Sequence, residues 1–167
     1  RNRTITEAFR GQIPKRIVYG IVKNEAFNGS YKFNPFNFEH AGVTQTSVYV
    51  NGKCHPYLPF SPNYSDGDYM REFHSLFSAM GIHHYNRGLD ISRDDYPNGY
   101  CLYAHDLTQN MGASDGSVLN LIRKGEVTID LQFGSTLREN MTYIVVGEYD
   151  NMMEIDGDRN IFLNFSA

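Results

Sequence analysis

The stretch VTQTSVYVNGKCHPYL, residues 43–58, decides the fold, because it sets a turn signal between two runs suited to strands. Asn51 and Gly52 both tolerate a positive φ, which the tightest two-residue hairpin turns require. The sequence therefore predicts an antiparallel hairpin here. Proline cannot donate to a neighbouring strand, so we expect the prolines that follow to close this part of the sheet. These prolines are Pro56, Pro59 and Pro62.

The β pattern continues on both sides of this hairpin. Residues 126–133 alternate apolar and polar side chains, as a strand with one buried and one wet face does. Residues 141–150 are apolar on both faces at their centre, so we expect a second layer or a neighbouring subunit to cover both sides. Four further stretches are predicted strands: residues 13–27, 31–38, 99–107 and 161–165.

Two stretches change to a helical pattern. Six apolar side chains of residues 65–81 fall on one helical face, which predicts a helix packed on the core. Residues 114–125 predict a shorter helix that ends at Gly125. With residues 1–12 as a polar lead-in or linker, residues 13–167 form a single domain. Its predicted class is all-β with one or two inserted short helices, as an antiparallel eight-stranded jelly-roll sandwich.

The composition describes a folded and mildly acidic chain. Its 167 residues carry a net charge of −4, whereas a dedicated nucleic-acid-binding protein is usually strongly basic. The first sixteen residues are the exception, since they contain five basic side chains and one acidic side chain, Glu7. We interpret this segment as a short basic arm or a solvated leader. No apolar run is long enough to span a bilayer. Two cysteines make neither a disulfide framework nor a zinc cage.

The densest acidic stretch is EYDNMMEIDGDRN, residues 148–160. A helix-flanked calcium loop needs glycine at its sixth position and glutamate at its twelfth. Counted from Asp156, those positions hold Ile161 and Ala167, and the flanks are strand-like. We therefore interpret the stretch as a strand end, a turn at Asp156 and the start of the last strand, with carboxylates that face solvent or a neighbouring subunit.

Other residues with chemical potential occur as neighbours in the chain: His83–His84, Cys54–His55 and His105–Asp106, with Cys101 alone. Adjacent side chains usually point in different directions, so a shared metal ion is awkward, and the His-x-His pair of metal-binding cupins is absent from the sequence. We assign no catalytic, cofactor-binding or metal-binding residue and do not expect an enzyme. The polar loops 82–98 and 108–117 leave an alternative open: a lectin-like or receptor-like jelly-roll binding module, or a minor penton-type capsid protein.

Four stretches together carry a resemblance to a known family: IPKRIVYGIVKNEAFNGSYKFNPFNFEH (13–40), NYSDGDYMREFHSLF (63–77), RGLDISRDDYPNGYCLYAHDLT (87–108) and EYDNMMEIDGDRNI (148–161). The chain resembles the C-terminal part of the major capsid (hexon) protein of Maverick/Polinton elements and their adintovirus relatives. The resemblance covers nearly the whole chain after its first dozen residues.

The resemblance implies a structural role in a virion. Family members are double jelly-roll proteins whose trimers form pseudo-hexameric capsomers of an icosahedral shell around double-stranded DNA, assembled inside the host cell. The implied partners are further copies of the chain, neighbouring capsomers, a penton or minor capsid protein, a packaging ATPase and a maturation protease. This chain has room for one jelly roll, so the resemblance makes it the second roll of a longer protein. No catalytic residue and no cofactor is implied.

Overall fold

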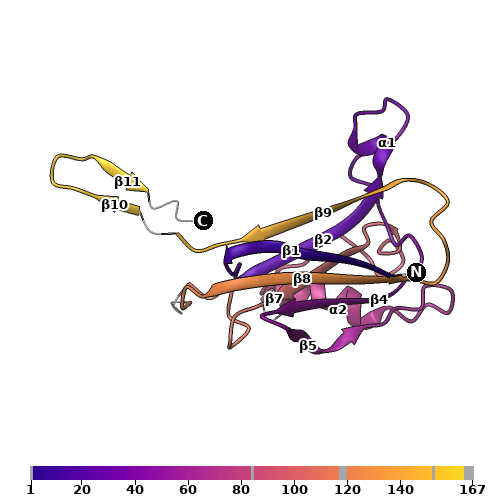
Figure 1. Ribbon diagram of the computed structural model, residues 1–167, viewed down its shortest axis with the longest axis horizontal. Helices are drawn as coiled ribbons and strands as arrows, with labels where there is room; N and C mark the ends of the chain where they lie inside the picture. The colour runs from indigo at the N-terminus through magenta and orange to yellow at the C-terminus, as the bar shows by residue number, and fades with distance from the viewer. Residues whose placement is uncertain (1, 84, 117–119, 152, 164–167) are drawn as a thin grey trace.

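Two antiparallel sheets form the body of the protein in the computed structural model, which describes residues 2–83, 85–116, 120–151 and 153–163 (Figure 1). The larger sheet has the order β1-β8-β4-β5 and the smaller sheet the order β7-β2-β9. The strands of the larger sheet are β1 (Asn2–Gln12), β4 (Val43–Val50), β5 (Lys53–Phe60) and β8 (Lys124–Phe133). Those of the smaller sheet are β2 (Arg16–Lys23), β7 (Leu102–Asp106) and β9 (Met141–Glu148).

The predicted hairpin is confirmed as β4–β5. Val50 pairs with Lys53 across a two-residue turn, in which Asn51 has φ 49° and Gly52 has φ 76°. Both residues therefore take the left-handed conformation that matches the twist of the flanking strands. The prolines do not end the sheet at once, because β5 continues through Pro56 and Pro59. It tolerates them as the outer strand of its sheet, in a part where the pairing with β4 is irregular.

The core lies between the two sheets and follows the alternation read from the sequence. Val127, Ile129 and Leu131 of β8 are almost completely buried, as predicted for one face of this strand. They belong to the same apolar cluster as Ile17 and Ile21 of β2 in the opposite sheet. Burial of each such side chain contributes about 1.5–3 kcal/mol, so this cluster is the main source of stability.

A stack of aromatic rings on the smaller sheet reaches the larger sheet at the centre of the core through the Tyr19 hydroxyl. The ring of Tyr19 in β2 lies 5.2 Å from that of Tyr103 and 5.4 Å from that of His105, both in β7. The Tyr19 hydroxyl is 2.8 Å from Thr46 Oγ1 in β4 and 3.0 Å from His105 Nε2. Since a buried hydroxyl without a partner is costly, this shared site fixes how the sheets align.

Two short helices accompany the sheets among the described residues. The predicted helix is confirmed as α2 (Met70–Ala79), which packs against β7 and ends before Gly81, at φ 68°. It begins later than expected, and Tyr69 precedes it without a side-chain cap. The single turn α1 (Asn24–Phe27) follows β2 directly.

Several sequence-based expectations were wrong. Residues 2–12 are not a lead-in but form β1, which pairs with β8 from Asn2↔Gln132 to Gln12↔Lys124. Residues 31–38 turn without forming a strand, except where β3 (Phe38–Glu39) pairs with β6 (Asn98–Gly99). The helix expected over 114–125 is absent from its described residues, because 114–116 and 120–123 are turns or irregular and β8 starts at Lys124; residues 117–119 lie outside the described part.

The strand β9 is less covered than its sequence suggested. It is an outer strand of the smaller sheet, its residues are mostly half-buried, and Val146 is 59% exposed. Within the described residues, one face of β9 is therefore open, and cover by a neighbouring subunit, the other arrangement that the sequence suggests, stays a prediction. The apolar residues of its outward face remain available for contacts with a second layer or subunit.

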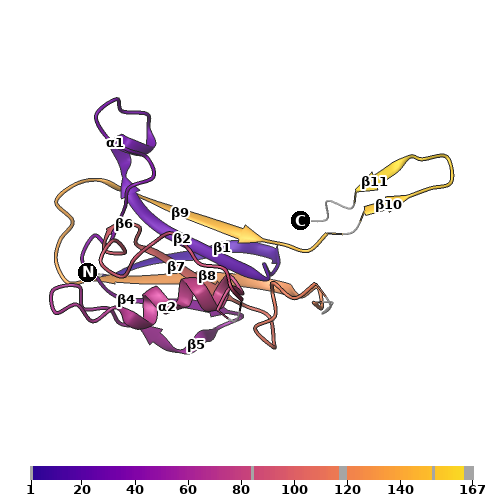
Figure 2. The same ribbon diagram turned by 180° about the vertical axis from the view of Figure 1, so that it is seen from behind.

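The C-terminal strands stand apart from the sandwich. β10 (Met153–Ile155) and β11 (Ile161–Leu163) pair only with each other, and this hairpin projects away from the body (Figures 1 and 2). The last predicted strand is thus confirmed over 161–163, whereas residues 164–165 lie outside the described part. In the portions of the chain that are described, neither helix has the length and apolar character needed to cross a membrane.

Candidate functional site

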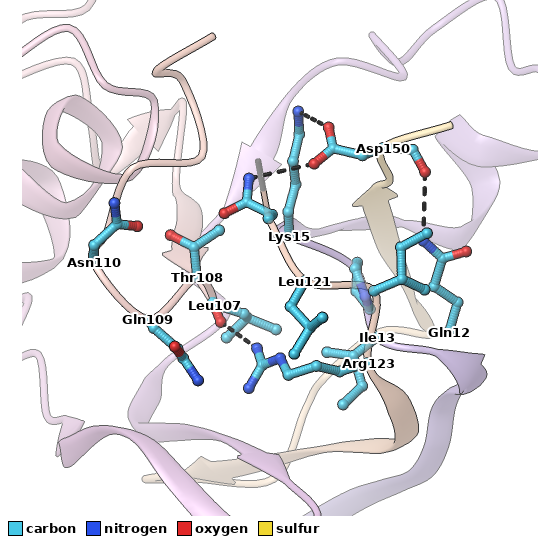
Figure 3. A pocket seen from close by; sticks show the side chains of 13 residues that line it. Gln12, Ile13, Lys15, Leu107, Thr108, Gln109, Asn110, Leu121, Arg123 and Asp150 are labelled. Carbon is cyan, nitrogen blue, oxygen red and sulfur yellow. Dashed lines mark hydrogen bonds and ion pairs between the residues drawn. The ribbon is translucent and has the colours of Figure 1, made fainter. Parts of the chain in front are cut away.

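A polar cleft of about 300 Å³ opens where β1 and β9 end, and its side chains come from four separate segments (Figure 3). These segments are residues 12–15, 107–110 and 120–123, together with Asp150. Lys15 lies 2.6 Å from Asp150 Oδ1 and 3.2 Å from Glu148 Oε1. The hydrogen bond from Lys15 holds the pKa of the Asp150 carboxyl below its usual value, and the same bond raises the pKa of Lys15.

Lys15 and Asp150 are the ion pair of this cleft, and polar groups around them bond the same aspartate or nearby carbonyls. Asn120 Nδ2 donates to Asp150 Oδ2 at 3.3 Å, and Gln12 Nε2 donates to the Asp150 carbonyl at 3.4 Å. Arg123 donates to the Leu107 carbonyl at 2.5 Å. Because Lys15 and Asp150 neutralise each other, this pair is suited to holding chain segments together. These contacts therefore tie residues 12–15 to the end of β9, and we call them the clamp.

A buried arginine extends this clamp to the end of α2. Arg16, whose side chain is 8% exposed, donates from Nε to the Ala79 carbonyl at the end of α2 at 2.7 Å. Its Nη1 is 2.5 Å from Glu148 Oε2, and its Nη2 bonds Ser114 Oγ. Arg16 thereby joins β2, β9, α2 and the loop before β8. A positive charge at a helix C-terminus also complements the helix dipole.

A second hollow, of about 660 Å³, lies between β5, α2 and β7. We call it the basic groove and define it by six of its lining residues: His55, Phe60, Arg71, His74, Leu107 and Arg123. Arg71 donates to the carbonyls of Leu58 and Pro59 at 2.6 and 2.7 Å, and its guanidinium lies 5.0 Å from the centre of the Phe60 ring.

The basic groove holds more positive than negative charge. Both of its arginines donate to backbone carbonyls rather than to carboxylates in the contacts of the described residues. Asp106 is the one carboxylate among the described lining residues. It already accepts hydrogen bonds from the Thr108 backbone N–H and hydroxyl and from the Ala113 N–H. The groove therefore favours an anionic group from outside.

Of the histidines singled out in the sequence, His55 and His105 line the basic groove together, whereas His83 does not. His105 is buried against Tyr19, and desolvation lowers its pKa to about 3, so it is neutral at physiological pH. His83 Nδ1 lies 3.1 Å from His74 Nε2, while His84 lies outside the described residues. Within the described ranges, no three His, Cys, Asp or Glu side chains gather in a way that suits a metal ion.

The two thiols occupy structural positions. Cys54 Sγ donates to the Pro56 carbonyl at 3.2 Å, and Cys101 is buried 3.1 Å from the Tyr64 hydroxyl. Burial is the largest influence on both groups and raises the pKa of each thiol. A reactive cysteine needs the opposite shift, because the thiolate is the nucleophile.

The acidic stretch divides into two halves. Glu148 and Asp150 bind Lys15 and Arg16 while their side chains stay 45% and 42% exposed, so they are partly solvent-facing as predicted, but the sequence analysis missed their ion pairs. The signal was present in the sequence, because antiparallel pairing of the two strands places Arg16 opposite Glu148. The expected turn at Asp156 is confirmed: its Oδ1 accepts the N–H of Asp158 at 2.9 Å and that of Asn160 at 2.8 Å.

Comparison with known proteins gives one distant similarity. A Caenorhabditis elegans protein described as uncharacterized is 28% identical to this chain over 156 residues. The match covers 91% of this chain and 36% of that protein, so the chain spans about a third of the relative's length. No family model and no solved structure matches the chain.

Proposed function

We propose that the sandwich is a jelly roll, and the order of its strands is the observation that carries the proposal. A jelly roll distributes eight strands over two sheets in the orders 1-8-3-6 and 2-7-4-5. The larger sheet, β1-β8-β4-β5, corresponds to 2-7-4-5, and the smaller sheet, read as β9-β2-β7, corresponds to 8-3-6. With this correspondence, the strands of both sheets take jelly-roll positions 2 to 8 in the order in which they occur along the chain.

The first jelly-roll strand has no counterpart among the described residues. In this correspondence its place is the outer edge of β9, where it would run antiparallel to β9 and lead into β1. Asn2, at the start of β1, lines the same hollow as Met141, at the start of β9, so the geometry suits such a connection. A strand there would also pair with the open backbone edge of β9.

We further propose that the chain is a structural subunit of a viral or transposon-derived capsid, located in the virion shell. The supports are the proposed correspondence of the strand order to a jelly roll, the resemblance to Polinton-type major capsid proteins and the exposed apolar side chains that project from the body. The excursion after β2 exposes Phe27, Tyr31 and Phe36, and such side chains gain stability when a neighbouring subunit covers them. A longer protein would supply the other jelly roll, and trimers would form the capsomer.

Electron microscopy of the full-length protein, with size-exclusion chromatography and light scattering, tests this proposal. We expect trimers with a pseudo-hexagonal outline, and shells when the penton protein is co-expressed. A full-length protein that stays monomeric at every concentration, with no trimers or shells, would overturn the capsid assignment. A density map without a strand along the outer edge of β9 would overturn the jelly-roll assignment.

A further inference from the structure

The β10–β11 hairpin has one face made entirely of apolar side chains. Its register pairs Met153 with Leu163 and Ile155 with Ile161, and residues paired across antiparallel strands project to the same side. All four are about half exposed or more. The opposite face carries Glu154 and Phe162. A two-stranded ribbon is marginally stable alone in water, so this face needs a surface to cover it.

The hairpin is also acidic and stands clear of its own sandwich. Residues 153–163 contain three acidic residues, Glu154, Asp156 and Asp158, and one basic residue, Arg159. Both views show the ribbon extending outward beyond the end of β9 (Figures 1 and 2). It thus presents an apolar face and a negative tip at a distance from the body, where another molecule can receive them.

The basic groove has the complementary character. Arg71 and Arg123 line it without a carboxylate partner in the described contacts. Its apolar floor is formed by Met111, which is 63% exposed, beside the almost fully buried Phe60 and Leu107. Its volume of about 660 Å³ accommodates several side chains. Charges that complement each other across an interface guide association and fix its register.

We infer that the β10–β11 hairpin is an exchange arm that docks in the basic groove of a second copy of this chain. Met153, Ile155, Ile161 and Leu163 rest on the groove floor, and the acidic turn meets the two arginines. The inference goes beyond the proposed capsid role, because it names a contact between copies that a capsomer or a simple oligomer can use alike.

The two faces of the ribbon provide a matched test. Ile161→Ser removes an apolar side chain from the docking face, whereas Phe162→Ser removes one of similar exposure, 57% against 60%, from the opposite face. Sedimentation velocity over a concentration series measures self-association. We expect Ile161→Ser to weaken it by about fivefold and Phe162→Ser to leave it within about twofold. Equal effects of the two variants would overturn the assigned docking face.

A charge exchange tests the groove itself. Asp158→Lys and Arg123→Glu should each weaken association by about fivefold, and the double variant should recover most of the loss. Arg138→Glu, a reversal at an exposed residue outside the groove, should not rescue Asp158→Lys. Thermal unfolding of each variant identifies any that fails to fold. Retention of wild-type association by both single variants would overturn the inference, as would a groove occupied by the arm of the same molecule.

These results separate the inference from the capsid proposal. If full-length protein forms trimers or shells while arm and groove variants assemble normally, the exchange arm is refuted and the capsid role stands. If arm variants lose association but the full-length protein never forms a capsomer, the arm stands and the capsid role is refuted.

Discussion

Replacing Arg16 tests whether the clamp between β2, β9 and α2 stabilises the fold. Arg16→Met keeps most of the apolar stem and removes the guanidinium. The Ala79 carbonyl, Glu148 and Ser114 then lose a charged donor. Breaking a buried ion pair costs about 3–5 kcal/mol. Because the Glu148 side chain is 45% exposed and regains water, we reduce this figure and expect a loss of about 2–3 kcal/mol.

Equilibrium unfolding in urea measures the loss directly, and a thermal scan should show a melting temperature lower by roughly 5–10 °C. The control is Arg10→Met on β1, where the side chain is 79% exposed and meets Glu7 at 3.5 Å. This change should cost less than about 0.5 kcal/mol. If Arg16→Met is as mild as Arg10→Met, the clamp does not stabilise the fold and our reasoning about the sheet ends fails.

Three further predictions follow from single features. Gly52→Ala should lower the free energy of unfolding by about 1–2 kcal/mol because Gly52 has φ 76°, whereas Gly157→Ala, with open space around it, should cost little; urea unfolding of both compares them. Acid should destabilise the protein through His105, since the unfolded chain binds a proton at pH 6.5 that the folded chain accepts only near pH 3. Between pH 6.5 and pH 3, stability should therefore fall by up to about 1 kcal/mol per pH unit, and a His105→Phe variant whose acid slope equals that of the wild type would contradict this. Asp156→Ala combined with Asp158→Ala should loosen the exposed turn but leave the melting temperature of the dilute protein within about 2 °C, and a large drop would mean that the hairpin supports the sandwich.

The sequence predicted well where local chemistry and burial agree. The β4–β5 turn was predictable because Asn51 and Gly52 favour the same backbone conformation that the sheet twist requires. β8 was predictable because alternate residues such as Ile129 meet the core. The mostly β, antiparallel fold and helix α2 follow from such segments, whereas α1 lies where the sequence predicted a strand.

Prediction failed where pairing over a long distance decides the structure. β1 has a polar, charged sequence and is largely exposed, so no periodicity marks it; it is a strand because β8 offers an edge. The aromatic residues of 31–38 suggested a strand, yet Tyr31 and Phe36 lie exposed in turns. The groove arginines were missed because their surroundings come from β5, α2 and β7, which only the fold brings together.

The aromatic stack between the sheets also gives the protein an optical signature. The sequence has 12 tyrosines and no tryptophan, so near-ultraviolet absorbance and emission come almost wholly from tyrosine. Burial raises the pKa of Tyr19, Tyr96 and Tyr103 well above the usual value of about 10. In alkali these rings stay un-ionised until the sheets separate, so the late rise of phenolate absorbance reports the opening of the sandwich without any attached dye.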